Sequence, residues 1–482
     1  MKKFSFLALM LLLGIFLSAC TEDELESEAD TAPILEGVVT AESNEAEESD
    51  TRQIPLLEEN EAVQGENEAT SQVTILTMGG WLFSSEARAK VNDFNQENTL
   101  YQIELINFSA QYAEGELPDF SLEGAPDILY GEMARSMASP NMFVDLWPFI
   151  DADSQINRED FFQNILEASQ FYDGRLPVIS STFYIQTVRA LSTLASDLDT
   201  WTIADLYAMV ERGFEDEKVY PLGVHTSVPS MLFFLLFYSG TDFIDLETGV
   251  SHLDSQEFYD ALQFLLLLSN NEPSEFPHFP TNEYRLRSGD HLLNVAPLWS
   301  VDDFTRFVTM MEGESFTFLG MPSSEGGIHG AGFFNPIGIT VHSEHPDVAW
   351  TFLRQFFLPD AMLGEVHFRG IPIRTDLFEN DIERFMTVEF TTYGSDGEEM
   401  GLRFESITID GEGVSVRPLT PEKADSLRIL IESISHAPLL DYEVLSIVLE
   451  ELEPFLAGER SACVTATIMQ VRVQLHLDTR LW

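Results

Sequence analysis

The chain has 482 residues, with 25 Lys and Arg against 81 Asp and Glu, which gives a formal net charge of −56. So acidic a protein repels phosphate groups, which counts against a nucleic-acid binder, and 44% hydrophobic residues exclude wholesale disorder. There are two cysteines, Cys20 and Cys463, so a disulfide framework is excluded as well. At about 100–200 residues per domain, this length predicts two to four structural units.

The N-terminus has the pattern of an export signal. A short basic start is followed by a nearly continuous apolar run over residues 4–16, and Leu17-Ser18-Ala19-Cys20 then places small residues before a cysteine. The run is too short to cross about 30 Å of hydrocarbon comfortably, which favours a cleaved signal over a permanent anchor. The stretch resembles the lipobox of bacterial lipoproteins, in which the cysteine is lipidated and becomes the first mature residue. We therefore expect a signal over residues 1–19 and a lipid anchor at Cys20 that holds the protein on the extracytoplasmic face of the cell membrane. The alternative is an ordinary secretory signal that happens to contain a cysteine.

The next segment is strongly acidic. Residues 21–70 contain 17 acidic residues, a single basic residue (Arg52) and no aromatic side chain. Such a composition cannot bury enough apolar surface to fold, and like charges keep it extended. We predict a lipidated cysteine and disordered tether over residues 20–70, with a cation-binding or interaction tail as the alternative. Residues 71–482 still carry a net charge of −42, which indicates a saline or alkaline external medium.

From residue 71 onward, strand and helix patterns alternate. A buried-strand run over 73–78 stops at Gly79-Gly80, and Ser84 or Ser85 is a suitable N-cap for a helix over 86–95. Strand patterns follow over 101–108 and 125–130, and this order predicts an α/β layer with parallel pairing. Later helices are expected over residues 202–213, 228–239, 255–269, 346–358, 421–435, 441–457 and 459–477. Because no Pro- or Gly-rich linker interrupts 71–482, this part is predicted to be one integrated body or lobes that share crossovers.

Motifs for catalysis and cofactor binding are mostly missing from the sequence. It has no phosphate-binding Gly-rich motif with Lys, no Gly-x-Ser-x-Gly and no His-Glu-x-x-His, and its ten histidines are scattered. We predict no enzyme, no cofactor and no metal site. The glycine-dense stretch 326–332 is interpreted as a turn or hinge that leads into a strand over 335–341. Cys463, on a predicted helix with Ile468 and Val471, is interpreted as a core residue.

Several stretches, in order, resemble the carbohydrate-type (family 1) extracellular solute-binding proteins of bacterial ABC importers. The chain departs from the family pattern after Asp173-Gly174-Arg175, where it passes directly into Leu176-Pro177 and shortens the strand that usually follows. The matching stretches are residues 73–81, 94–95, 101–104, 126–128, 143–150, 173–175, 201–202, 347–353, 370–374, 458–461 and 468–473.

The resemblance implies a two-lobed, periplasmic-binding-protein-like α/β fold over 71–482, with crossover hinge strands and a ligand cleft between the lobes. It also implies a membrane-tethered protein that captures a sugar or oligosaccharide by hinged closure and delivers it to ABC permease subunits. Two alternatives stay open. One is a surface glycan-sensing or adhesive lipoprotein with the same fold, and the other is a glycoside hydrolase, which would need two carboxylates at a fixed separation.

Candidate ligand residues follow from their positions in these stretches. Trp81 comes just after a strand, where open α/β sheets bind ligands, although it could instead cap the core. Trp299 lies in a predicted return strand and loop, and it too could contact the ligand or belong to the core. Arg374 could donate a forked pair of hydrogen bonds to a ligand or form a salt bridge with Asp376. The other candidates are Asp127 and Tyr130, at the two ends of the 125–130 strand, and Phe333 with Phe334, after the glycine-dense stretch.

Overall fold

A computed structural model describes most of the chain from residue 73 onward. All described residues belong to one compact unit, which comprises residues 73–112 and 117–482. The predicted signal, Cys20 and the tether lie outside the described residues, so they stay predictions. The described ranges are 73–109, 124–137, 141–171, 173–196, 198–216, 221–223, 226–271, 282–358, 370–387, 392–393, 399–400, 406–409 and 412–480.

The first sheet has the strand order β12-β3-β1-β2, with β1 (Thr74–Gly80) parallel to both β2 (Tyr101–Asn107) and β3 (Ile128–Tyr130). The fourth strand, β12 (Ile337–Ile339), is antiparallel to β3. The helix α2 (Ser85–Glu97) connects β1 to β2, and the side chain of Ser84 caps it by accepting the Ala87 N–H. The strands and helix predicted for this part of the chain are therefore confirmed.

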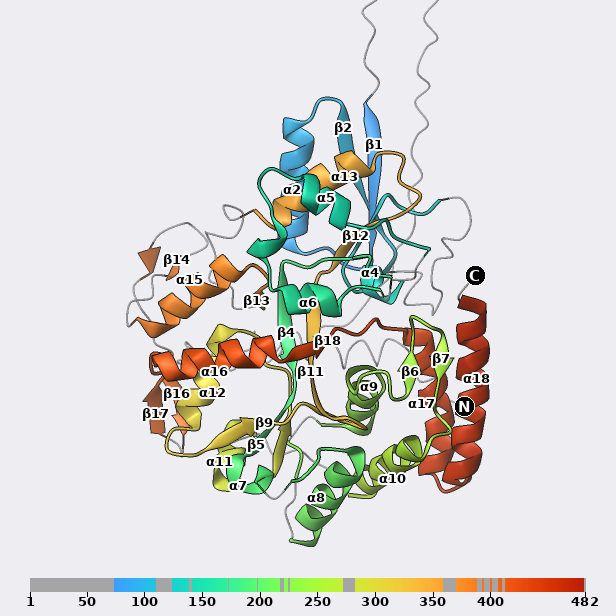
Figure 1. The fold of residues 1–482 in the computed structure, drawn as a ribbon, viewed down its shortest axis with the longest axis vertical. Coiled ribbons are helices and arrows are strands. Elements are labelled where there is room, and N and C mark those ends of the chain that lie inside the picture. The colour runs from blue at the N-terminus through green and yellow to red at the C-terminus, as the bar shows by residue number, and fades with distance from the viewer. Residues whose placement is uncertain are drawn as a thin grey trace, which may run out of the picture. The chain divides into compact units, whose positions relative to one another are not determined.

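A second sheet has the order β10-β11-β4-β13, in which β11 (Gly326–Phe334) and β4 (Thr182–Gln186) are antiparallel neighbours (Figure 1). The outer strands β10 (Met321–Ser323) and β13 (Ile371–Pro372) pair with β11 and β4, and β18 (Ile434–His436) joins β11 in parallel. A third, three-stranded sheet has the order β8-β5-β9. Its strands are β5 (Val188–Leu191), β8 (Leu293–Val295) and β9 (Phe316–Phe318).

Two of the connections between the first and second sheets lie side by side; a further one, from β12 to β13, passes through residues outside the described ranges. The chain leaves β11 at Phe334, which pairs with Thr182, and enters β12 at Ile337, which pairs with Ile179. Asn335 makes the turn between them with a left-handed φ of 49°, a conformation that asparagine tolerates better than most residues. Crossover strands, as expected for the predicted fold class, are therefore present.

The glycine-dense stretch 326–332 is not a loop, because it forms most of β11 itself. Its glycines are required for close packing: a Cβ on Gly332 would lie 2.0 Å from the Tyr184 ring, and one on Gly327 would lie 1.7 Å from the Leu319 carbonyl oxygen. The interpretation of this stretch as a turn is therefore wrong, and the chain turns after the strand has ended, at Asn335.

The predicted later helices are present, with shifted ends. The expected helix over 421–435 ends at Glu432 and gives way to β18, and the one over 459–477 begins at Ala462. The described helices after α2 are α4 (Glu132–Ser136), α5 (Trp147–Ala152), α6 (Gln163–Ala168), α7 (Ser192–Ala195), α8 (Ile203–Glu215), α9 (Val228–Tyr238), α10 (Gln256–Asn271), α11 (Asn282–Ser288), α12 (Val301–Met310), α13 (Pro346–Leu353), α15 (Thr375–Met386), α16 (Pro421–Glu432), α17 (Tyr442–Leu456) and α18 (Ala462–Arg480). Short hairpins are β6 (Ile244–Asp245) with β7 (Val250–Ser251), β14 (Thr392–Tyr393) with β15 (Glu399–Met400), and β16 (Ser406–Ile409) with β17 (Glu412–Ser415).

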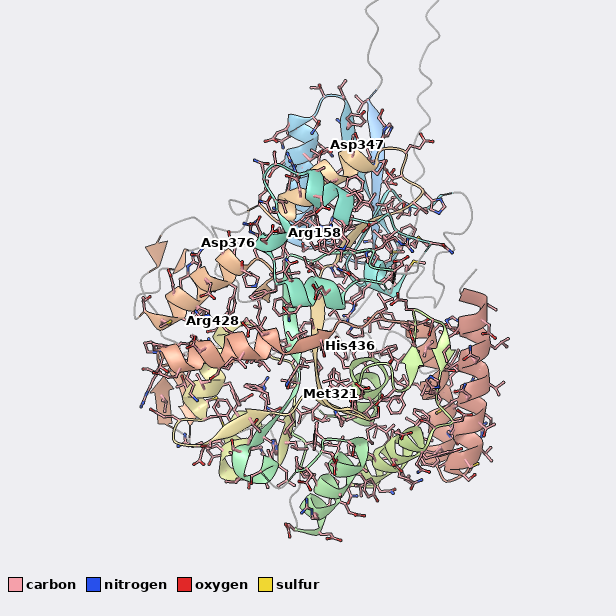
Figure 2. All side chains as sticks on the ribbon, in the orientation of Figure 1. Arg158, Met321, Asp347, Asp376, Arg428 and His436 are labelled. Carbon is pink, nitrogen blue, oxygen red and sulfur yellow. The ribbon has the colours of Figure 1, made fainter. Side chains whose placement is uncertain are left out.

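Both large sheets share one continuous hydrophobic core. Met78 of β1 and Phe183 of β4 are fully buried members of it. Burial of a side chain of this size contributes about 1.5–3 kcal/mol, so the core rather than any polar contact holds the sheets together. His436 of β18 is held on the interior side, where its Nε2 lies 2.9 Å from the Phe237 carbonyl oxygen of α9 (Figure 2).

The C-terminal helix corrects one prediction. Cys463 is exposed at the start of α18, and Val471 on the same helix is 62% exposed. The buried face of α18 is instead formed by Ala466, Met469 and Val473. Apolar spacing alone did not say which side of the helix faces the core. No helix in the described part of the chain is long and apolar enough to span a bilayer.

Candidate functional site

The candidate site begins where two parallel strands of the first sheet end. Strand β1 ends at Gly80 and leads into Trp81, and β3 ends at Tyr130 and leads through Gly131 into α4. Gly131 has a φ of 71°, a left-handed conformation that glycine adopts without strain, and this turn starts α4 at the sheet edge. Open α/β sheets bind ligands outside the carboxyl ends of their strands, so α4 occupies the edge where a ligand is expected.

Arg135 connects α4 to a distant part of the chain. Only 2% of its surface is exposed, its Nε donates to the Pro438 carbonyl oxygen at 3.0 Å, and its Nη2 donates to the Tyr238 hydroxyl at 3.1 Å. Burial acts to lower the pKa of the guanidinium, but Tyr238 and Glu132 together raise it, so Arg135 keeps its charge. Its Nη1 makes no hydrogen bond to another described residue, which leaves a donor for a ligand.

Glu132, one helical turn before Arg135, is half-buried. Tyr442, at the start of α17, donates its hydroxyl to Glu132 Oε2 at 3.3 Å, and the Tyr442 ring meets Trp81 edge to face with centroids 6.0 Å apart. Burial raises the pKa of Glu132, against the opposing effects of Arg135 and the Tyr442 hydroxyl. Trp81 and Glu132 are therefore brought together around one tyrosine from the C-terminal part of the chain.

Four aromatic residues contact one another, and one of them, Tyr238, also binds Arg135. We call these four the aromatic cluster: Tyr184, Tyr238, Trp299 and Phe334. The Tyr184 and Tyr238 hydroxyls are 2.9 Å apart. The Tyr184 ring lies 4.9 Å from the Trp299 ring and 5.3 Å from the Phe334 ring, measured between centroids. Tyr184, Trp299 and Phe334 are half-buried, so each keeps part of its ring accessible.

Together these residues offer the chemistry of a carbohydrate site. Aromatic faces pack against the C–H face of a sugar ring, while a carboxylate, a guanidinium and phenol groups bind hydroxyls in fixed directions. The contacts form two series that start from α4. One joins Glu132 through Tyr442 to Trp81, and the other joins Arg135 through Tyr238 and Tyr184 to Trp299. No group of three or more metal-ligating side chains occurs among the described residues.

Of the predicted site residues, Trp81, Trp299 and Phe334 fall in this region. Phe333 points the other way, because neighbouring residues of a strand face opposite sides, and it is 7% exposed within the core. The structure therefore favours Phe334 of the predicted pair.

Asp127 and Tyr130 are engaged in structural contacts. The Asp127 carboxylate accepts the backbone N–H of Thr77 at 2.8 Å and the hydroxyl of Ser343 at 2.8 Å, which ties β1 to the segment after β12. Tyr130 is 1% exposed, with its hydroxyl 2.8 Å from Ser84 Oγ, and burial raises its pKa to about 12. These contacts support a role in the first sheet for both residues.

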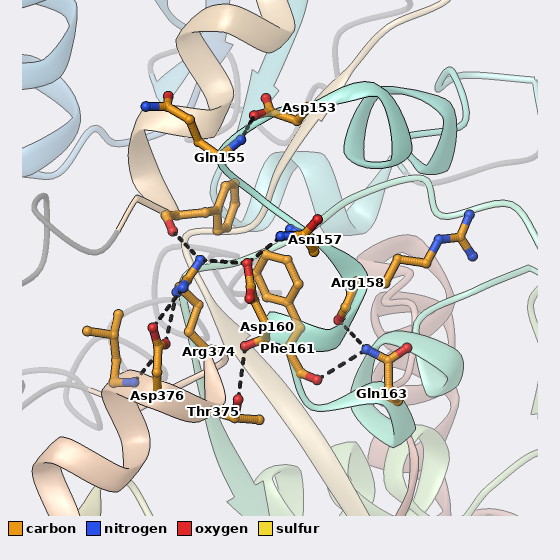
Figure 3. A network of polar contacts seen from close by, with 12 residues as sticks. Asp153, Gln155, Asn157, Arg158, Asp160, Phe161, Gln163, Arg374, Thr375 and Asp376 are labelled. Carbon is orange, nitrogen blue, oxygen red and sulfur yellow. Dashed lines mark hydrogen bonds and ion pairs between the residues drawn. The ribbon is translucent and has the colours of Figure 1, made fainter.

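Arg374 takes the second of its two predicted roles. Its Nη2 lies 2.7 Å from Asp376 Oδ2, and its Nη1 lies 3.3 Å from Asp160 Oδ2 and from the Phe357 carbonyl oxygen (Figure 3). All described partners of Arg374 belong to this network, and none belongs to the aromatic cluster.

Sequence reasoning did not find Glu132, Arg135, Tyr184, Tyr238 or Tyr442. The spacing of Glu132 and Arg135 directly after a predicted strand offered a signal, because residues three apart share one face of a helix. The three tyrosines come from other segments of the chain: Tyr238 lies 103 residues from Arg135 and Tyr442 lies 310 residues from Glu132. Nothing in their local sequence links them to α4.

Comparisons with known proteins bear on the fold. No protein-family model matches the sequence, and no curated protein sequence matches it. Among solved structures, the sugar-binding protein MalE from Xanthomonas citri aligns with 85% of this chain and 98% of its own, at 15% identity and a TM-score of 0.51. A putative oligosaccharide periplasmic-binding protein from Synechococcus sp. MITs9220 aligns with 84% of this chain and 99% of its own, at 13% identity and a TM-score of 0.49. An ABC transporter solute-binding protein from Agrobacterium radiobacter K84, in complex with ribitol, aligns with 84% and 98%, at 13% identity and a TM-score of 0.48.

The chain therefore has the MalE-like fold of the solute-binding proteins of ABC transporters. This is the fold class that the sequence predicted.

Proposed function

We propose that this protein is the solute-binding component of an ABC importer and captures a sugar or oligosaccharide. The observation that carries the proposal is the set of partly exposed aromatic rings joined to a buried arginine at the carboxyl ends of β1 and β3. Trp299 and Tyr184 supply stacking faces, and Arg135 and Glu132 supply a donor and an acceptor for hydroxyl groups. The MalE protein that shares this fold is a sugar-binding protein, which supports a binding role over an enzymatic one.

A panel of neutral di- and trisaccharides, a polyol and an amino sugar tests the proposal by thermal shift. A ligand present at a hundred times its Kd stabilises the folded state by about 2.7 kcal/mol, so a true ligand raises the melting temperature clearly. We expect one or more neutral sugars to do so. If no member of the panel shifts the melting temperature, sugar capture is refuted.

Isothermal titration of variants then locates the site. Trp299→Ala should weaken binding of the stabilising sugar at least tenfold, because it removes a stacking face. Trp201→Ala is the matched control: Trp201 is also a tryptophan, but its indole donates to the Gly320 carbonyl oxygen outside the aromatic cluster. Equal losses of affinity in the two variants would show that the loss reflects general destabilisation.

We further propose that Cys20 carries a lipid anchor and that a permease receives the ligand. The lipobox-like sequence Leu17 to Cys20 supports the anchor, and the fold supports the permease partner. In a bacterial host, the protein should fractionate with membranes, and Cys20→Ala should release it. A protein that stays with membranes after Cys20→Ala would refute the anchor. A glycan-sensing or adhesive lipoprotein would bind the same sugar, but its deletion would leave uptake of the labelled sugar unchanged.

A further inference from the structure

Next to Trp299 lies an ionic cluster in which a buried arginine of the third sheet meets two carboxylates from helices α11 and α12, whose side chains are 21% and 30% exposed. Arg189 of β5 has 1% of its side chain exposed, and its Nη1 is 3.4 Å from Glu283 Oε1, while its Nη2 is 3.8 Å from Asp303 Oδ2. The guanidinium also packs over the Phe307 ring at 5.0 Å. Sequence analysis singled out none of these residues. In the described contacts they reach the aromatic cluster only through the backbone of Trp299 and of the residues before it.

The cluster holds the segment that carries Trp299 by its backbone. Arg189 Nη2 donates to the carbonyl oxygens of Pro297 at 2.7 Å and Ala296 at 3.3 Å. Asp303 Oδ2 accepts the backbone N–H of Trp299 at 3.0 Å. Because Leu298 exchanges both of its backbone hydrogen bonds with β4 at residue 185, each of the four residues from 296 to 299 is fixed.

We propose that Arg189 and Asp303 are positioning residues that set the orientation of Trp299 for ligand binding and make it depend on pH. This inference rests on the proposed function, because it takes the Trp299 ring to stack against the ligand. A stacking ring contributes only when it is held at the right angle and distance, so a contact that fixes its backbone acts on affinity without touching the ligand.

Stability does not explain this cluster. Burying an arginine costs desolvation energy, which attraction to two partly exposed carboxylates often fails to offset, and apolar replacements of buried ion pairs are frequently as stable. Part of this desolvation energy is not recovered here. Arg189 and Asn294 are paired residues of β5 and β8, and Arg189 Nε and Asn294 Oδ1 have no hydrogen-bond partner among the described residues. A purely structural solution would have been an apolar core.

The charge state of Asp303 supplies the pH dependence. The charged groups around it are Arg189 on β5, Glu283 on α11 and Asp302 on its own helix. Although 30% of the Asp303 side chain is exposed, desolvation of its carboxyl raises the pKa to about 6. Arg189 and the Trp299 N–H act to lower the pKa, and Glu283 and Asp302 act to raise it. Below that pH the carboxyl takes up a proton, loses its attraction to Arg189 and becomes a weaker acceptor for the Trp299 N–H.

The sign of the effect separates positioning from simple stabilisation. A carboxyl whose pKa is higher in the folded than in the unfolded state stabilises the fold when protonated, and that contribution is lost as pH rises through about 6. The part of the global stability that depends on Asp303 should therefore increase on acidification, while Trp299 becomes less firmly held. A purely structural ion pair would make both fall together.

Fluorine NMR of the full chain labelled with 5-fluorotryptophan tests this directly. The Trp299 resonance is assigned by its loss in Trp299→Phe and followed from pH 7.5 to 5. We expect it to shift with a midpoint near 6, and we expect this transition to vanish in Asp303→Asn, which keeps an acceptor oxygen but cannot ionise. Asp381→Asn is the matched control, because burial also raises the pKa of Asp381 to about 6 in a different helix, and it should leave the Trp299 transition unchanged.

Binding is then measured with the neutral sugar that gives the largest thermal shift. Asp303→Asn should bind it about fivefold to tenfold more weakly at pH 7.5, and the parent should lose a similar factor between pH 7.5 and 5, the difference between a charged and a neutral hydrogen bond. A Trp299 transition that persists in Asp303→Asn overturns the positioning role. If the transition depends on Asp303 but no sugar binds at any pH, the positioning role stands and the proposed sugar-binding function falls.

Discussion

Two buried arginines allow the candidate site to be tested against a site of purely structural importance. Arg135 and Arg374 are 2% and 4% exposed, and both donate to a carbonyl oxygen as well as to side chains. Methionine fills a similar volume without the charge, so Arg135→Met and Arg374→Met remove comparable networks. Only the first of them belongs to the proposed ligand site.

The expected loss of stability is similar for the two variants. Arg135→Met removes two hydrogen bonds from a charged donor, at about 1.5–3 kcal/mol each, and leaves the Tyr238 hydroxyl and the Pro438 carbonyl without that donor. Arg374→Met removes contacts to Asp160 and Asp376, whose side chains are 27% and 50% exposed, so solvent screening reduces its cost to about 2–3 kcal/mol. Both folded states should survive at 25 °C, because the large shared core is untouched.

The expected effect on ligand affinity differs sharply. A charged donor to a ligand hydroxyl contributes about 1.5–3 kcal/mol, so Arg135→Met should weaken sugar binding by at least tenfold, while Arg374→Met should change it less than twofold. Isothermal titration with the stabilising sugar measures the affinities, and urea unfolding measures the stabilities. An affinity loss in Arg374→Met without one in Arg135→Met would refute the assignment of the site to α4.

Two further predictions concern packing and pH. Gly332→Ala should destabilise the protein by about 1–3 kcal/mol and weaken sugar binding, because its Cβ would lie 2.0 Å from Tyr184 and force that ring out of the aromatic cluster; a crystal structure with Tyr184 unmoved would contradict this. Burial raises the pKa of Asp381 to about 6, above its value in the unfolded chain. The protonated carboxyl therefore stabilises the fold at low pH, and about 3 kcal/mol of the free energy of unfolding is lost as pH rises from 4 to 7.5. Asp381→Asn should remove that part of the pH dependence in urea unfolding, and an unchanged slope would argue against a buried carboxyl.

The fold was largely predictable because its signals are local. The run over 73–78 followed by Gly79-Gly80 identified β1, and Ser84 identified the start of α2. Where prediction failed, tertiary packing decided. The glycines of β11 signalled flexibility in the sequence, yet they are there because Tyr184 and Leu319 pack against the strand.

The candidate site was only partly predictable. Trp81 was predicted because it follows a strand pattern, and Trp299 because it lies in a predicted return strand and loop; a large aromatic residue at such a place suggests a ligand face. Arg135 was missed because its importance depends on Tyr238, which lies 103 residues away on a helix that is buried along nearly its whole length. Arg374, by contrast, has a visible partner two residues ahead in Asp376, so its salt bridge could be foreseen, but the additional contact to Asp160 could not.

The crossover at Asn335 leads to a final prediction about closure. A bend between the two large sheets would change the backbone of the paired crossovers, where Asn335 has a left-handed φ of 49°. Glycine adopts that conformation readily but also many others, so Asn335→Gly should loosen the crossover while costing little stability. In small-angle scattering we expect the radius of gyration of the parent to fall when the stabilising sugar binds. The unliganded variant should have a larger radius than the unliganded parent, and the two liganded proteins should agree. Sugar affinity should drop modestly in the variant, because binding must then draw on a smaller closed population. If the unliganded radii are equal and the parent does not contract at saturating sugar, the protein binds its ligand without hinged closure, and the bending assigned to Asn335 is refuted.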